Sequence, residues 1–360
     1  MATLDDLFRE YLHRVQPDKN AVKRASKAHK PLREELEKDE SYGPHVAKTM
    51  LSGSYGRGTA TFYIKDVDVI LQTTFTRELL QAEKRDDETE QHCLLQLTQD
   101  AIRRTGRAAR TRKARRSIHV TLPEELNDLG ETVPELTMDI VPVLLQYGED
   151  VDPMTIADRE LEEWYDTYPA TQLEDSRTRN ENSAEIGDRH SYKPLVKIFK
   201  AWKKVHYDLQ KTPKGFILEC LTGSYHNPWA IHWIDAVHDL FANICLAWPD
   251  PDNLDDIPKV PDISDSSPHM IPIAKTVDEA QDVLTTIHNH LALIEQAMEE
   301  AETDLTQSAQ TLQRVFGEDC DDICFPLQED LDEPENGGSK GRSSPFKQSR
   351  SDVREAPEFG

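Results

Sequence analysis

The sequence has far less positive than negative charge and no long apolar run. It contains 42 lysines and arginines against 67 acidic residues, which gives a formal net charge of −25 over 360 residues. A field of that sign repels polyanions and argues against stable nucleic-acid binding by the surface as a whole. No stretch approaches the roughly 18 apolar residues of a membrane helix, so we expect no membrane association.

Cysteines are also few. There are five, an odd number, and they are widely scattered, which indicates a reducing compartment. Cys320 and Cys324 form the one close pair, but no histidine lies near them, so we predict no zinc site. The N-terminus, MATLDDLFRE, is acidic and lacks the pattern of a signal peptide. Together these features predict a cytoplasmic protein.

Two aspartates stand close together in the segment DVDVIL. Side chains alternate along a strand, so Asp66 and Asp68 project from the same face. Two carboxylates about 4 Å apart repel each other by roughly 4 kcal/mol at an effective dielectric of about 20. A divalent cation between them removes that repulsion, and magnesium shared with substrate phosphates suits such oxygen ligands. The alternative is a solvated strand edge.

A glycine-serine turn precedes this strand. Gly53 allows the backbone to approach a ligand, and Ser54 adds a hydroxyl and an amide donor. Amides in such a turn can bind an anion, although no Gly-Lys-Ser/Thr follows to make a Walker loop. By itself the pair is an ordinary turn. Followed by the two aspartates, it predicts a phosphate held beside a metal.

This spacing resembles the signature of polymerase-beta-like nucleotidyltransferases, which use a third carboxylate from a neighbouring strand. Asp139 fits that role because it is the one charge inside the apolar run LTMDIVPVLL, where a lone acid is costly. The alternative is a surface aspartate at a strand end. Asp66, Asp68 and Asp139 then predict a two-metal site, in which Asp139 takes the proton of an attacking ribose hydroxyl.

Basic residues concentrate in Arg103–Arg116, where RRTGRAARTRKARR carries eight of them. One hypothesis is an anion-binding rim for nucleotide or polynucleotide. The other, which we favour, is a solvated loop paired with the acidic surface, with Arg116 as the exception because it borders the next strand.

A lysine-rich helix is predicted over His190–Gln210. Its lysines recur at helical spacing and would ordinarily be solvated: Lys193, Lys197, Lys200, Lys203 and Lys204. Because the predicted site binds a triphosphate, we expect Lys197 or Lys200 to contact the phosphates as a point charge.

The segment GSY at 223–225 ends the next predicted helix. Ser224 offers a hydroxyl, and Tyr225 offers an aromatic face to a nucleotide base. The alternative is that Tyr225 fills the core beside Trp229.

These residues together resemble the bacterial cGAS/DncV-like nucleotidyltransferases (CD-NTases) over about residues 4–327. The N-terminal pattern and PKGFILECL favour clade D within that family. The matching segments are GSYGRGTA at 53–60, DVDVIL at 66–71, LTMDIVPV at 136–143, YKPLVKIFKAWKK at 192–204, PKGFILECL at 213–221 and LQRVFGEDCDDICFP at 312–326.

The resemblance implies an α/β (α+β) fold. A polymerase-beta-like nucleotidyltransferase core with a mixed sheet would occupy residues 1–185, together with the N-terminal helices. A helical lobe similar to that of 2′-5′-oligoadenylate synthetases would occupy 186–327. Independently of the resemblance, the few apolar residues and many charged, Ser, Gly and Pro residues predict a disordered acidic and polar tail at 328–360.

The implied activity joins NTPs, with ATP as the expected substrate and GTP as a second candidate, into a cyclic di- or trinucleotide. This product activates a downstream effector in CBASS anti-phage defence. The implied roles are donor-triphosphate binding by Gly53 and Ser54, binding of two Mg²⁺ ions (or Mn²⁺) by Asp66 and Asp68, and hydroxyl activation by Asp139. Lys200 would touch phosphates, Ser224 would assist and Tyr225 would stack on a base. The zinc-ribbon residues of the animal sensor are missing, which argues against activation by DNA.

The sequence ends in Phe359–Gly360. In many such operons an E1/E2-type partner conjugates the C-terminus of the nucleotidyltransferase to a target, and a tail ending at Gly360 resembles that arrangement. A cloning remnant is the alternative.

Two other functions stay open at this point. One is a linear nucleotidyltransferase acting on tRNA, protein or a small molecule. The other is a catalytically silent nucleotide-binding scaffold, against which the presence of all three carboxylates counts.

Overall fold

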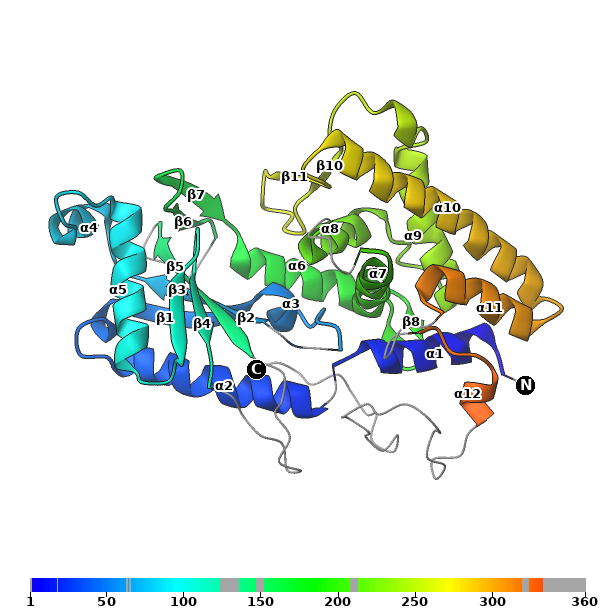
Figure 1. The fold of residues 1–360 in the computed structure, drawn as a ribbon, viewed down its shortest axis with the longest axis horizontal. Coiled ribbons are helices and arrows are strands. Elements are labelled where there is room, and N and C mark those ends of the chain that lie inside the picture. Colours follow the sequence, from blue (N-terminus) through cyan, green and yellow to red (C-terminus); the bar gives the residue numbers. More distant parts are fainter. Residues whose placement is uncertain are drawn as a thin grey trace. The chain divides into compact units, whose positions relative to one another are not determined.

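The computed structural model describes residues 2–17, 19–62, 64, 66–123, 136–146, 152–207, 213–318 and 324–332 (Figure 1). They fall into two compact units, each described here by itself. The sheet unit is Pro17–Asp175 with Ser264–Ser267, and the helical unit takes the described residues within 1–16, 176–263 and 268–360. This division differs from the expected boundary at 185/186. It falls inside α6 (Pro169–Glu181) and assigns α1 (Leu4–Val15) to the helical unit.

The sheet unit is built on one mixed sheet. Its main path of hydrogen-bonded strands is β1-β2-β5-β4-β3. Off this path, β6 pairs with β5, and β7 pairs with β6. The β2–β5 pair is parallel, whereas the other neighbours are antiparallel. The strands are β1 (Val46–Ser52), β2 (Asp66–Thr73), β3 (Arg110–Lys113), β4 (Ile118–Thr121), β5 (Thr137–Leu145), β6 (Met154–Asp158) and β7 (Glu163–Thr167). The predicted α/β fold with a mixed sheet is therefore confirmed.

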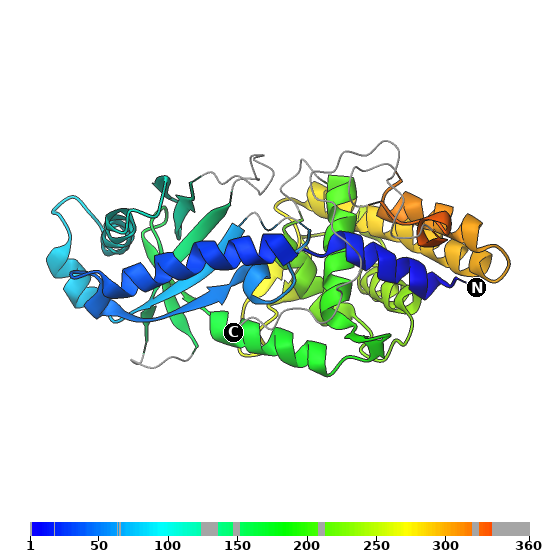
Figure 2. The ribbon, with the colours of Figure 1, turned by 90° about the horizontal axis from the view of Figure 1, so that it is seen from below.

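Helices cover one face of this sheet. Alternate strand residues such as Val67, Val69 and Ile140 are fully buried in a core that also takes apolar residues of α2 and α5. Figure 2 shows α2 in blue running across the strands. The helical elements of the sheet unit are α2 (Lys19–Lys38), η1 (Gly43–His45), α3 (Gly53–Gly56), α4 (Arg77–Glu83), α5 (Glu90–Arg104) and the first part of α6.

The opposite face is apolar at one end and polar at the other. Ile70, Val143 and Met154 form a small buried cluster on it. Because side chains on one face recur every second residue, this face continues from Ile70 to Asp68 and Asp66 on β2. The predicted site therefore occupies the polar end of a face whose apolar end is packed.

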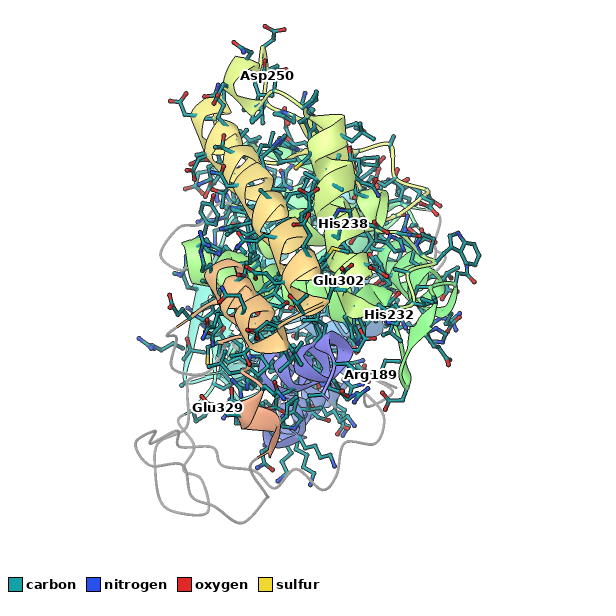
Figure 3. All side chains as sticks on the ribbon, turned by 90° about the vertical axis from the view of Figure 1, so that its right-hand side faces the viewer. Arg189, His232, His238, Asp250, Glu302 and Glu329 are labelled. Carbon is teal, nitrogen blue, oxygen red and sulfur yellow. The ribbon has the colours of Figure 1, made fainter. Side chains whose placement is uncertain are left out.

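The helical unit carries most of the remaining helices. Its helical elements are α1, the remainder of α6, α7 (Tyr192–Tyr207), α8 (Gly215–Tyr225), α9 (Trp233–Ala247), η2 (Pro251–Asn253), α10 (Val277–Ala301), α11 (Leu305–Phe316) and α12 (Glu329–Asp332). Two short hairpins join them, β8 (Glu185–Ile186) with β9 (Arg189–His190) and β10 (Lys259–Pro261) with β11 (Met270–Pro272). In Figure 3, α9 carries His238, whose Nε2 lies 3.7 Å from Glu295 Oε1 on α10.

An aromatic cluster joins α1 to the chain after α11. The ring centroids of Phe8 and Phe325 are 5.0 Å apart, and those of Tyr11 and Phe316 are 5.5 Å apart. This packing explains why α1 belongs to the helical unit. The disordered tail was expected to begin at residue 328, but Glu329–Asp332 forms the short helix α12. Residues 333–360, with the predicted conjugation residue Gly360, lie outside the described residues. No described helix is long and apolar enough to cross a membrane.

Candidate active site

The register between β2 and β5 brings three carboxylates to one face. Asp68 pairs with Asp139 and Asp66 pairs with Thr137 in the parallel ladder. Paired residues of neighbouring strands point to the same side, so Asp66, Asp68 and Asp139 project together. Asp66 is exposed and the other two are half-buried, so all three are within reach of a ligand from solvent.

The glycine-serine turn packs directly against this row. Ser52, the last residue of β1, pairs with Asp68, and Gly53 follows with φ +61°. A Cβ on Gly53 would overlap Asp68 Oδ2 and lie 2.6 Å from Asp68 Cγ, so glycine is required both for the backbone conformation and for the space. Ser54 follows in the short helix α3, held in place by the buried Tyr55.

Two side chains, one on β4 and one directly before it, face Asp139. His119 lies opposite Asp139 in the antiparallel β4–β5 ladder, with its Nδ1 3.2 Å from Asp139 Oδ1. The hydroxyl of Ser117 donates to the same oxygen at 3.4 Å. On the next rung the Thr137 hydroxyl donates to Asp66. Sequence reasoning missed His119, although its place between the buried Ile118 and Val120 could have assigned it to the polar face.

The donor set fits a divalent cation. Neither Asp66 nor Asp139 forms an ion pair with a lysine or arginine among the described residues, so their charges are left for another cation. Within that same part of the chain, no three His, Cys, Asp or Glu side chains form a ready-made metal cluster. Carboxylates of this kind hold magnesium together with substrate phosphates and water rather than in an all-protein cage.

Comparison with known proteins decides the family. The model of the Second Messenger Oligonucleotide or Dinucleotide Synthetase domain matches residues 1–180. The chain belongs to this family.

Relatives agree with that assignment. This chain, called the synthetase below after the matched domain, is 28% identical over 311 residues to a cyclic AMP-AMP-AMP synthase of an Acinetobacter species. The match covers 84% of this chain and 81% of the relative. The structure of Escherichia coli MS115-1 CdnC with ATP matches with a TM-score of 0.64 at 17% identity, covering 87% of this chain and 98% of that chain. The structure of Bradyrhizobium diazoefficiens CdnG with GTP matches with a TM-score of 0.62 at 14% identity, covering 88% and 95%.

These findings confirm the predicted class. The synthetase is a CD-NTase of the kind found in CBASS, and its enzymatic class is nucleotidyl transfer leading to cyclic oligonucleotides. A linear nucleotidyltransferase and a silent scaffold are not favoured. The family depends in general on divalent metal. Assignment to clade D stays a prediction.

The predicted phosphate-binding lysines of the synthetase lie on α7 in the helical unit. Lys197 is 8% exposed and forms no ion pair with a described residue. Its burial, together with the charges of Arg189, Lys193 and Lys200, lowers the pKa of Lys197 to about 7. Such a crowded set of cations is stabilised by an anion. The phosphate contact of Lys197 stays a prediction.

Lys200 has a different environment. Its Nζ lies 2.6 Å from Oε1 of Glu219, a carboxylate on α8 that is 1% exposed. Because a buried carboxylate needs a partner, Lys200 has a structural role that sequence reasoning did not foresee. A contact of Lys200 with phosphates would compete with this pair.

Ser224 and Tyr225 end α8. Ser224 is exposed, and the ring of Tyr225 packs at an edge-to-face angle on Trp248, with centroids 5.5 Å apart. The alternative to base stacking was that Tyr225 fills the core beside Trp229. Trp229 is 77% exposed and therefore not part of a core, so this part of the alternative is wrong. These residues and the lysines belong to the helical unit, whereas Gly53, Ser54 and the three aspartates belong to the sheet unit. Their meeting in one site therefore stays a prediction.

Most of the basic run is paired, as the favoured interpretation expected. Arg104 binds Asp39 at 2.7 Å, and Arg107 lies 3.3 Å from Glu35. Arg116 was the expected exception, but its Nε lies 2.8 Å from the buried Asp158, so that expectation is wrong. Asp158 also binds Arg115, and the two guanidinium groups hold the pKa of its carboxyl well below the usual range despite burial. The loop prediction is corrected as well, because Arg110–Lys113 forms the edge strand β3.

Proposed function

We propose that the synthetase joins NTPs, with ATP as its main substrate and GTP as a second candidate, into a cyclic di- or trinucleotide. The observation that carries this proposal is the rung formed by Asp68 and Asp139, against which the Gly53 backbone packs. A phosphate-binding turn beside carboxylates on one open face suits nucleotidyl transfer. The relative that makes cyclic AMP-AMP-AMP supports adenine as the base.

Each residue of the sheet unit has a proposed task. The amides of Gly53 and Ser54 bind the donor triphosphate, and the missing side chain of Gly53 leaves room beside Asp68. Asp66 and Asp68 would hold two magnesium ions, for which manganese can substitute, together with Asp139. When bound, these ions neutralise phosphate charge and acidify the attacking hydroxyl. Asp139 accepts the proton of that hydroxyl, and His119 and Ser117 fix the orientation of its carboxylate.

The predicted nucleotide-binding residues of the helical unit have proposed tasks of their own. Lys197 is the better candidate for a phosphate contact because no described carboxylate pairs with it, whereas Lys200 pairs with Glu219. Tyr225 would stack on a base with the face that Trp248 does not cover, and Ser224 would donate its hydroxyl to the nucleotide.

The test is product analysis. The purified protein is incubated with the four NTPs and Mg²⁺ or Mn²⁺, and the products are treated with phosphatase and identified by mass. A cyclic product resists phosphatase, whereas a linear product loses its terminal phosphates. We expect Asp66→Ala combined with Asp68→Ala to abolish NTP turnover while the protein stays folded. Asp86→Ala, which removes an exposed acid of the same unit, should retain full activity. Turnover by the double variant equal to wild type would remove the assignment.

Location and partners are part of the same proposal. The described cysteines, Cys93, Cys220, Cys245 and Cys324, are buried and form no disulfide with one another, which supports the cytoplasm. The cyclic product would act on a downstream effector. Conjugation at Gly360 by an E1/E2-type partner is tested by deleting Phe359–Gly360, which should stop conjugation without changing catalysis by the purified protein. Unchanged conjugates would reject it.

A further inference from the structure

One residue of the basic run, Arg112, faces the catalytic side of the sheet and has no side-chain partner among the described residues. β3 pairs with β4 so that Arg112 lies opposite His119, and His119 lies opposite Asp139. The rung continues to Asp68 on β2. Paired residues share a face, so Arg112 projects from the same side of the sheet as the carboxylates.

The neighbours of Arg112 on β3 confirm its direction. The Thr111 hydroxyl accepts hydrogen bonds from Gln99 and Arg103, and Lys113 Nζ donates to Gln96 at 2.7 Å. These partners belong to α5, which covers the other face of the sheet. Because side chains alternate along a strand, Arg112 points away from α5 and toward the open face.

Arg112 also differs from the arginines around it in charge pairing. Arg104, Arg107, Arg115 and Arg116 all pair with carboxylates. Arg112 is exposed and forms no hydrogen bond or ion pair with a side chain in the described ranges. In a protein of net charge −25, an arginine that no described side chain pairs with, beside a row of acids, is available to an anion brought by a substrate.

The position of Arg112 among the paired strand residues indicates which anion it binds. From one edge of the sheet to the other, this row is Ser52, Asp68, Asp139, His119 and Arg112. Strands lie about 4.8 Å apart, so Arg112 is about 10 Å from Asp139 and about 19 Å from Ser52, at the level of the Cα atoms. The donor triphosphate is proposed at Gly53 and Ser54, next to Ser52 and thus at the far edge of the row. The acceptor hydroxyl is proposed at Asp139, between the two edges. An acceptor nucleotide that extends toward β3 carries its own 5′-phosphates to Arg112.

We propose that Arg112 binds the 5′-phosphates of the acceptor nucleotide and so makes the enzyme prefer a nucleotide to a nucleoside as acceptor. This inference rests on the proposed nucleotidyl transfer. Its guanidinium provides two parallel donors that match phosphate oxygens. The contact positions the acceptor, and Arg112 takes no part in proton transfer.

The experiment separates donor from acceptor. 2′,3′-Dideoxy-ATP serves as a donor that cannot accept. The acceptor is either labelled adenosine or labelled ATP supplied as its α,β-methylene analogue, which can accept but cannot donate. For Arg112→Gln we expect kcat/KM for ATP as acceptor to fall about tenfold, the size of one charge-assisted hydrogen bond, with adenosine as acceptor unchanged. Arg107→Gln removes the same charge from the same run at a position paired with Glu35 and should leave both values unchanged.

Several results would overturn the inference. If the ratio of kcat/KM for ATP to kcat/KM for adenosine is the same in Arg112→Gln as in the wild type, the inference fails. The same holds if kcat/KM falls equally for both acceptors. Weaker binding of an RNA or DNA oligonucleotide with unchanged use of ATP would assign Arg112 to polynucleotide binding instead. If the wild type forms no phosphodiester product, the proposed function fails. Titration with a non-hydrolysable ATP analogue then tests Arg112 directly, because the variant should weaken one of two binding events about tenfold, and unchanged binding rejects the contact.

Discussion

Replacing Gly53 by alanine tests the most specific contact of the candidate site. At φ +61° an alanine costs roughly 1–2 kcal/mol of backbone strain. The added methyl would also meet the Asp68 carboxylate, with Cγ at 2.6 Å, so Asp68 must move. A displacement of about 1 Å in a catalytic group can cost about a hundredfold in rate. We therefore expect Gly53→Ala to lose about a hundredfold in kcat/KM.

The protein contains a matched control for the strain. Gly106 has φ +66°, and a Cβ there would meet nothing within 4 Å. Gly106→Ala should therefore lose about 1–2 kcal/mol of unfolding free energy, as Gly53→Ala does from strain alone, while keeping its activity. Urea unfolding measures the first quantity, and initial rates of pyrophosphate release from ATP with Mg²⁺ measure the second. If the two variants have kcat/KM values within about twofold of each other, the contact between glycine and Asp68 has no catalytic importance.

Three other predictions follow from single contacts. Lys200→Met removes the cation that lies 2.6 Å from the buried Glu219 and should cost about 3–5 kcal/mol in urea unfolding, most of which Glu219→Gln should restore in the double variant; a stable single variant would contradict the structural role. Burial lowers the pKa of His290 to about 4. The unfolded chain therefore binds a proton at this residue before the folded protein does. The free energy of unfolding is unaffected above about pH 6.5 and falls by up to about 3 kcal/mol as the pH is lowered toward 4. His290→Leu should show a smaller loss of unfolding free energy over that range, and an identical loss would reject this origin. His119→Phe removes the hydrogen bond to Asp139 and should lower kcat about 10- to 100-fold and weaken Mn²⁺ binding measured by spin resonance, whereas His119→Gln should retain more of both. Equal behaviour of the two variants would show that the hydrogen bond is unimportant.

The sequence by itself determined the local part of the site. The period of two along a strand places Asp66 and Asp68 on one face whatever surrounds them. The resemblance called for a third carboxylate, and a single acid within an apolar run singled out Asp139. The glycine before Ser54 marked a turn where the backbone can approach a ligand. These inferences depend on neighbours in the chain, so no long-range information was needed.

Only the tertiary structure decided which distant residues meet. The register that sets Asp139 beside Asp68 is a long-range property, and a slip by one residue would turn Asp139 to the other face. The same holds for His119 beside Asp139, for Glu219 beside Lys200 and for the direction of Arg112. A charged residue in a sequence shows no partner, because its pairing is fixed by the packing of strands and helices that lie far apart in the chain.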